Sequence, residues 1–477
     1  MVYRNHTERY NMGLQKVYHF IQVLRQEKIT DRTLQQYLYG ALGEPLPIDV
    51  HRAMFIPTLE NQADDEQQKK WLPLARNFKI FGAYAQTELG HGSNVQGIET
   101  TATYDKQTQE FVIHSPTLTS RKWWPGGLGK TGEFQVLDYQ NQQFVLFPFI
   151  ALSYAAFFAG KSMIKLHDSA LDVITTGGSS FGLKLAELHA VSSGLKAWLA
   201  ENVNNGIESC RRLCGGHGFS HSSNLAHIFN EAVGAVTYEG TFDVLVQQHA
   251  RYLVKVLVSL PYKTEQNGPE GPTLTSFLAR AKALADPSQR CSAVHGQDFL
   301  DLALLLAAFE TRATRAILRL AAALQASNND QNACMVLMTR ASMAHSELIL
   351  LQSFVQGLNV IPSGKNRDAV TTLCALFGLW LMTKNLGDFR EDNYLSSRQA
   401  DQAREQLLAL LPIVRKNAVL LTDAWDFTDF EINSTIGRYD GDIYRAMVRR
   451  AEDEPLNKSQ IPESYATYLK PLIQSSL

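Results

Sequence analysis

The chain has 477 residues, of which 45% are apolar and 19% are charged, and its formal net charge is −2. This length exceeds what one hydrophobic core usually supports, so we expect two to four domains. The near-neutral charge argues against nucleic acid or an anionic membrane surface as a general partner. We find no run of about 18 apolar residues, and therefore expect no membrane span. Five scattered cysteines, an odd number, are typical of free thiols in a reducing compartment.

The first half of the chain predicts helices, then strands, then helices again. Residues 1–80 carry apolar residues at helical spacing, with a further helix expected over residues 64–76. Residues 81–133 alternate polar residues with Thr, Val, Ile and aromatic residues, a pattern typical of half-buried strands. Helical patterns return over residues 134–260, which are dense in Ala, Leu and Phe.

The second half begins with a Pro- and Gly-rich stretch at residues 261–274, the best candidate for a linker. After it, long amphipathic helices are predicted to pack as a bundle, over residues 302–324, 335–358, 369–386 and 403–421. We therefore predict a mostly α protein with a small central β-region. Its expected domains are an N-terminal helical domain, a small β-domain, a middle helical domain and a C-terminal helical domain, at residues 1–80, 81–133, 134–260 and 275–477.

The strand region carries the most informative local chemistry. Glycine clusters at residues 90–92 and 126–129 flank the strands, and Gln86, Thr87, Ser93 and Asn94 gather near the first cluster. Glycine lets a backbone approach a flat or anionic ligand closely, and exposed N–H groups can bind an anion or a ring heteroatom. The region therefore predicts a wall built against a large cofactor.

Glu239, in the sequence AVTYEGTFDV, is the candidate base. A carboxylate between an aromatic residue and a glycine, after an apolar run, could be partly desolvated, which would raise its pKa and improve it as a base. The alternative is a solvated glutamate at a turn, and the spacing of one carboxylate favours that alternative.

The segment Cys210–His221 contains Cys-x3-Cys-x2-His-x3-His. Thiolate and imidazole are usual zinc ligands, but no second ligand pair stands nearby. A helix that ends at Cys214, followed by a glycine loop at residues 215–218, explains the segment better. His249, His295 and His345 are expected to be isolated surface or core residues.

Several of these segments together resemble the peroxisomal acyl-CoA oxidases, which are FAD-linked relatives of the acyl-CoA dehydrogenases. The segments are AQTELGHGSN, ETTATYD, FVIHSPT, KWWPGGLGK, CGGHG and the YEG at residues 238–240. The resemblance implies that Glu239 removes the α-proton of a fatty acyl-CoA while the β-hydrogen leaves as hydride to FAD. The products would be a trans-2-enoyl-CoA and, once O2 reoxidises the flavin, hydrogen peroxide.

The resemblance also implies roles for other residues. Thr87 and Gly126 match flavin contacts, and Gln86 and Trp124 are neighbours with weaker support. Gly216 and His217 lie in a loop that reaches the FAD of a second subunit in this family, which implies a homodimer. No metal is expected.

Three departures from the family pattern accompany the resemblance. Residues 130–132 lead almost directly into FQVLDYQNQQF, so a long internal stretch of the family is absent and the β-domain is truncated. Glu239 is followed by Gly-Thr-Phe where the oxidases prefer Gly-Asp/Glu-Asn. The tail is Ser-Ser-Leu where the family has Ser-Lys-Leu, which the peroxisomal import receptor reads, so the expected location is the peroxisome with the cytoplasm as alternative. Two other functions stay open: an inactive, oxidase-like interaction protein, and an acyl-CoA dehydrogenase.

Overall fold

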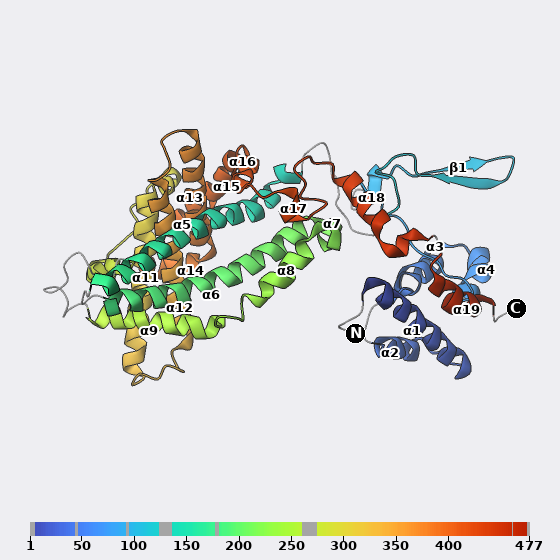
Figure 1. The fold of residues 1–477 in the computed structure, drawn as a ribbon, viewed down its shortest axis with the longest axis horizontal. Coiled ribbons are helices and arrows are strands. Elements are labelled where there is room, and N and C mark those ends of the chain that lie inside the picture. Colours follow the sequence, from blue (N-terminus) through green and yellow to red (C-terminus); the bar gives the residue numbers. More distant parts are fainter. Residues whose placement is uncertain are drawn as a thin grey trace. The chain divides into compact units, whose positions relative to one another are not determined.

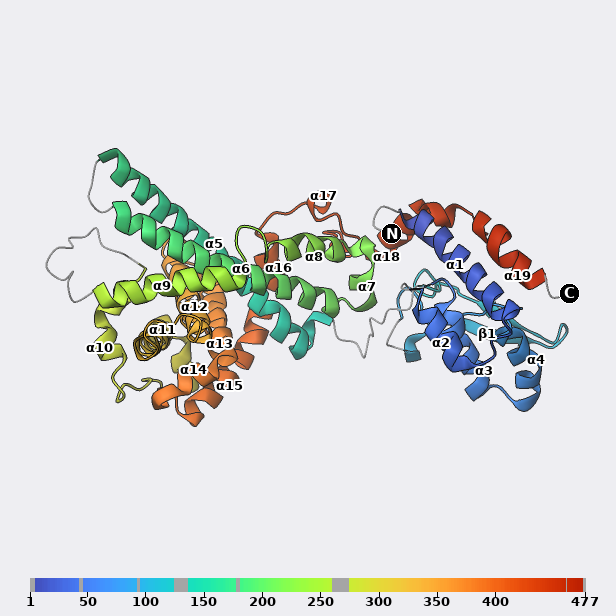
Figure 2. The same ribbon diagram turned by 90° about the horizontal axis from the view of Figure 1, so that it is seen from below.

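The computed structural model describes residues 5–42, 46–91, 95–123, 136–176, 181–259, 274–459 and 461–474. These residues form two compact units. One contains residues 1–129 together with residues 435–477, and the other contains residues 130–434. We call them the N-terminal unit and the helical unit, and describe each by itself (Figures 1 and 2).

The N-terminal unit combines short helices with one hairpin. Its helices and strands are α1 (His6–Gln26), α2 (Arg32–Gly40), α3 (Ile56–Gln62), α4 (Asp65–Arg76), β1 (Thr101–Asp105), β2 (Glu110–His114), α18 (Ile443–Asp453) and α19 (Lys470–Gln474). Helix α4 confirms the helix expected over residues 64–76. It begins where Asp64 accepts a hydrogen bond from the backbone N–H of Gln67, in a reciprocal capping box.

The C-terminal residues complete the core of the N-terminal unit. Leu472 is fully buried in one cluster with Val17, Phe20 and Ile21 of α1. The Arg25 guanidinium donates to the backbone carbonyl of Leu472 over 3.1 Å. From the sequence we expected residues 435–477 to pack with the C-terminal helices. An apolar stripe shows that a helix packs against something, but it does not show against which partner.

The two strands pair antiparallel, with Thr101 opposite His114 and Asp105 opposite Glu110. One face of the hairpin is apolar and carries Ala102, Tyr104, Phe111 and Ile113. Instead of the half-buried strands that we expected, nearly every position of both strands is exposed, including Ile113 at 73%. Alternation along a strand normally reflects a second layer that covers one face, and among the described residues of the N-terminal unit none supplies that layer.

The helical unit contains the long helices. They are α5 (Gln140–Thr176), α6 (Phe181–Leu213), α7 (Gly215–Phe219), α8 (Leu225–Gly234), α9 (Phe242–Ser259), α10 (Ala281–Leu284), α11 (Leu302–Ala326), α12 (Met335–Leu358), α13 (Lys365–Lys384), α14 (Leu386–Arg390), α15 (Ser397–Arg415), α16 (Ala418–Asp423) and α17 (Asp429–Ile432). Helices α5, α6, α9 and α12 pack side by side, and α11 and α13 pack on α12 (Figure 2).

The core of the helical unit is built around aromatic side chains. Phe309, Phe354 and Phe377, from α11, α12 and α13, are fully buried. Burying such a side chain stabilises a fold by about 1.5–3 kcal/mol. The mostly α fold with a small β-region is confirmed.

Helix α5 is long and apolar enough, by length and composition alone, to cross a membrane, which our reading of the sequence did not detect. In the structure Phe147, Ala151 and Ala155 of this helix are fully buried against the neighbouring helices. Core helices of helical bundles have the same composition.

Candidate active site

The predicted site residues are divided between the two units. Gln86 and Thr87 belong to the N-terminal unit, whereas Gly216, His217 and Glu239 belong to the helical unit. The predicted contacts Gly126 and Trp124, the second glycine cluster, Ser93, Asn94 and the terminal Ser-Ser-Leu lie outside the described residues.

The backbone of Thr87 is hydrogen bonded, whereas its side chain, among the described residues, is not. The N–H of Trp123 donates to the Thr87 carbonyl over 3.1 Å, and an isolated bridge pairs Glu88 with Lys122. The Thr87 hydroxyl is half-buried, and within the described part of the chain it has no hydrogen-bond partner. The Gln86 side chain accepts a hydrogen bond from the Tyr84 hydroxyl over 3.1 Å. Thr87 therefore offers a fixed, unused donor of the kind that a flavin edge needs.

Glu88 organises this segment, and our sequence analysis did not single it out. Its buried carboxylate accepts hydrogen bonds from the backbone N–H groups of Glu99 (3.0 Å) and Thr100 (2.9 Å). The imidazole of His91 lies 2.8 Å away and the ammonium of Lys122 lies 3.4 Å away. Burial by itself would raise the pKa of Glu88, but these hydrogen bonds outweigh it and lower the pKa to about 2. The feature of the sequence that could have identified Glu88 is an acidic residue beside a glycine cluster.

Residues 215–218, which we expected to form a loop, instead belong to the short helix α7 (Gly215–Phe219), and the glycines of this segment are explained by its packing. Gly215 has a φ of 57°, which favours glycine, and a Cβ at Gly218 would lie 2.0 Å from the Arg211 carbonyl oxygen. His217 is buried. The close approach that we expected here is therefore an approach to α6.

The cysteines beside this loop are poor candidates for metal ligands. Burial raises the pKa of the Cys210 thiol to about 11, with a further contribution from Cys214, and burial also raises the pKa of Cys214. A zinc ligand must be a thiolate. Among the described residues, no three His, Cys, Asp or Glu side chains are grouped as a metal site would require.

Glu239 lies in the turn that precedes α9. Its φ is 59° and that of Gly240 is 109°, so two consecutive residues adopt left-handed conformations. For a residue other than glycine this conformation costs roughly 1–2 kcal/mol. The Glu239 side chain is exposed, and so the helical unit by itself does not provide the desolvation that we expected.

A lysine on α6 contacts the same turn. The ammonium of Lys196 donates to the carbonyl oxygens of Tyr238 (2.7 Å) and Gly240 (2.5 Å), the residues on either side of Glu239. Sequence reasoning missed Lys196, because it precedes Glu239 by more than 40 residues and no local pattern connects them.

The Thr87 hydroxyl is a hydrogen-bond donor that suits the FAD implied by the resemblance. The unused Thr87 hydroxyl is the observation that supports this fit, and Glu88 holds the segment that carries it.

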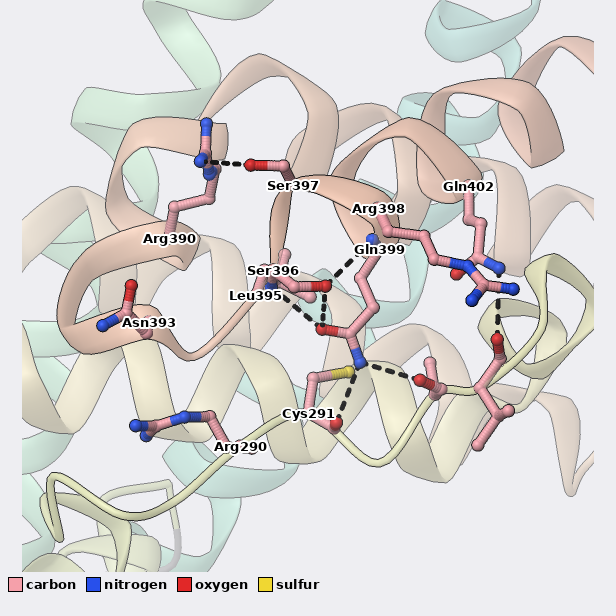
Figure 3. Close-up of a pocket in the computed structure, with 12 residues that line it drawn as sticks. Arg290, Cys291, Arg390, Asn393, Leu395, Ser396, Ser397, Arg398, Gln399 and Gln402 are labelled. Carbon is pink, nitrogen blue, oxygen red and sulfur yellow. Dashed lines mark hydrogen bonds between the residues drawn. The ribbon is translucent and has the colours of Figure 1, made fainter.

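A separate pocket of about 610 Å³ lies at the start of α15 in the helical unit (Figure 3). Arg290, Arg390 and Arg398 line it, and none of the lining residues in the described part of the chain is acidic. Arg390 donates to the Ser397 hydroxyl over 2.8 Å. The lining contains none of the predicted site residues and favours an anion over an apolar chain, so we do not regard this pocket as an acyl-chain site.

Three family models match the chain. They are described as "Acyl-coenzyme A oxidase N-terminal" (residues 1–81), "Acyl-CoA oxidase, C-alpha1 domain" (residues 121–254) and "Acyl-CoA oxidase" (residues 301–474). The two strands lie between the first two matches.

Individual relatives agree with these matches. The peroxisomal acyl-coenzyme A oxidase 1 of Arabidopsis thaliana is 32% identical over 577 positions, which cover 91% of this chain and 85% of the relative. Because the chain has only 477 residues, at least 100 of those positions have no residue here.

Two solved structures have the same fold. The Arabidopsis thaliana acyl-CoA oxidase 1 aligns with a TM-score of 0.68 at 30% identity, covering 99% of this chain and 92% of that one. The Caenorhabditis elegans acyl-CoA oxidase-1, solved in complex with FAD and ATP, aligns with a TM-score of 0.65 at 30% identity, covering 98% and 90%.

Proposed function

This chain belongs to the acyl-CoA oxidase family, and from that premise we propose that it is an FAD-dependent enzyme that oxidises fatty acyl-CoA to trans-2-enoyl-CoA. The resemblance seen in the sequence is confirmed by the family and structural matches. The observation that carries the proposal is the alignment of nearly the whole chain with a relative solved with FAD. Relatives are named peroxisomal oxidases, and we propose the same location and the first step of fatty acid β-oxidation.

The proposed base is Glu239. One of its carboxylate oxygens would take the proton from the α-carbon of the thioester, where the neighbouring carbonyl makes the C–H acidic. Bound FAD would supply the hydride acceptor for the β-hydrogen and pass both electrons to O2, which yields hydrogen peroxide. Since Glu239 is exposed in the helical unit, we propose that the acyl-CoA itself excludes water from the carboxylate on binding.

The remaining residues would bind the cofactor. The Thr87 hydroxyl, which has no other partner within the described residues, would donate to the flavin, with Gln86 and Gly126 beside it. We propose that Gly216 and His217 contact the FAD of a second subunit and that the chain works as a homodimer.

The test is the visible absorbance of the purified chain after addition of FAD. Anaerobic palmitoyl-CoA should bleach the bands of the bound flavin, and air should restore them with formation of peroxide. Glu239→Gln should keep the bands and lose the bleaching. The matched control is Glu231→Gln, an exposed carboxylate on α8, which should behave like the wild type.

An inactive interaction protein is the second candidate. The observations that favour it are the uncovered hairpin and the 100 or more alignment positions without a residue here. A chain that stays colourless after FAD is added would support this candidate and contradict the oxidase. Bleaching that air does not reverse, but an electron-transferring flavoprotein does, would instead indicate a dehydrogenase.

A further inference from the structure

The turn that carries Glu239 is strained. Glu239 and Gly240 have φ values of 59° and 109°. A Cβ at position 240 would lie 2.7 Å from a methyl carbon of Leu245, a buried residue of α9. A left-handed glutamate persists only where surrounding contacts hold it, so the contacts of this turn decide whether the carboxylate has a defined position.

Lys196 provides those contacts. Its ammonium donates to the carbonyls of Tyr238 and Gly240, over 2.7 and 2.5 Å. Within the described residues, neither carbonyl accepts a hydrogen bond from any other group. Hydrogen bonds from a charged donor are roughly twice as strong as neutral ones.

The helix that carries Lys196 is itself fixed. Leu195, Ala197 and Trp198, on either side of Lys196, are buried in the helical unit. The Trp198 indole N–H donates to the buried carboxylate of Glu347 over 3.0 Å. Because Lys196 is anchored on a well-packed helix, its hydrogen bonds hold the turn in a fixed position relative to α6.

We propose that Lys196 is the positioning residue of Glu239. By fixing the peptide units on both sides, it fixes the direction of the Cα–Cβ bond of Glu239 and hence the space that the carboxylate can reach. This inference rests on the proposed function, because it assigns Lys196 to the base of that reaction. One ammonium with several rotatable donors can serve both carbonyls, which a neutral side chain of the same length cannot.

The first experiment measures the turn directly, without substrate. Hydrogen exchange is followed at the Tyr238 amide, which bonds to the Gly234 carbonyl, and at the Leu245 amide, which bonds to the Thr241 carbonyl. In the Lys196→Met variant the Tyr238 amide should exchange at least about tenfold faster than in the wild type. In the Lys196→Arg variant part of its protection should return. The control is Lys255→Met, an exposed lysine of α9 without a recorded hydrogen bond, which should match the wild type.

The second experiment measures turnover of fatty acyl-CoA by the FAD-loaded chain. Lys196→Met should lower kcat by about 100-fold, as expected for a misplaced catalytic group, while KM and flavin content stay unchanged. Lys196→Arg should recover part of the kcat.

The outcomes separate this inference from the proposed function. Unchanged exchange in Lys196→Met overturns the inference whatever the enzyme does. Faster exchange with undiminished kcat also overturns it. If Lys196→Met exchanges faster but the wild type oxidises no acyl-CoA, Lys196 still stabilises the turn, and the proposed function is contradicted.

Discussion

The imidazoles of His249 and His345 are hydrogen bonded to each other in the core, with Nε2 of the first 2.9 Å from Nδ1 of the second. This corrects the expectation that the two residues are isolated. The outer nitrogens are also occupied, since His249 bonds to the Ser342 hydroxyl and His345 to the Leu274 carbonyl. Burial lowers the pKa of both, to about 4 for His345, and the neighbouring His345 lowers that of His249 further.

The first prediction is that acid destabilises the helical unit through this pair. The unfolded chain takes up protons near pH 6.5, whereas the folded pair remains neutral. The stabilisation is therefore complete above about pH 6.5 and is lost progressively as the pH falls from 6.5 to about 4, amounting to about 3 kcal/mol for His345. Thermal unfolding between pH 4 and 7.5 measures it.

His345→Gln, which cannot take up a proton, should reduce that pH dependence and leave only the share that His249 contributes through its burial. His227→Gln, at an exposed histidine of α8, should leave it unchanged. Equal acid sensitivity of His345→Gln and the wild type would show that the pair is not the cause.

A second prediction concerns Gly194 of α6, which makes room for His249. A Cβ at Gly194 would lie 2.0 Å from Nδ1 of His249, whereas a Cβ at Gly160 of α5 would meet nothing within 4 Å. Gly194→Ala should destabilise the protein by about 1–3 kcal/mol through overpacking. Gly160→Ala should stabilise it by up to about 1 kcal/mol, because alanine favours a helix. Chemical denaturation that ranks the two in the opposite order would refute the contact.

A third prediction concerns the buried ion pair between Arg312 and Glu347. The Glu347 carboxylate also accepts from Trp198 and Asn385, over 3.0 Å each, and Arg312 donates to Asp388 over 3.0 Å. Arg312→Met alone should cost about 3–5 kcal/mol, because it leaves the buried Glu347 carboxylate without an ionic partner. Glu347→Leu alone should cost less, because Arg312 keeps its ion pair with Asp388.

The double variant should cost less than the sum of the two, by at least about 1 kcal/mol. Urea unfolding of the four proteins gives the coupling. Additive costs would mean that the two side chains act independently.

A fourth prediction concerns Glu88. Its pKa is lowered to about 2 from an ordinary 4.5, so its stabilisation is complete above pH 4.5 and is lost as the pH falls towards 2. Glu88→Gln should destabilise the N-terminal unit by about 2 kcal/mol, measured by hydrogen exchange of the Glu99 and Thr100 amides. Glu110→Gln, on the exposed strand β2, is the control and should not change their exchange.

Local patterns predicted the helices well. Residues 335–358 were expected as one helix and form α12 with the same bounds, and the helix expected over 302–324 is α11. The segment 403–421 was only partly right, since α15 ends at Arg415 and α16 begins at Ala418. Apolar periodicity reports that a segment is amphipathic but is insensitive to a break of a residue or two between helices.

The candidate site was less predictable than the helices. Motifs pointed to Thr87 and Glu239, but the residues that hold them, Glu88 and Lys196, act through contacts that no local spacing reveals. The exposure of β1 and β2 was also unpredictable, because alternation along a strand assumes a covering layer, and the sequence of a strand does not state whether the rest of the chain supplies one.

The return of the C-terminal residues to the N-terminal unit has a consequence for biosynthesis. Residues 130–434 form a continuous stretch and can complete their core as soon as they leave the ribosome. Helix α1 is made long before Leu472, which belongs to the cluster around Val17 and Ile21. The cluster around α1 is therefore incomplete until residues 470–474 have been made, and a stop codon that removes α19 would leave Val17 and Ile21 without Leu472. Such a lesion would appear in the cell as misfolding around α1, far from the mutation in the sequence.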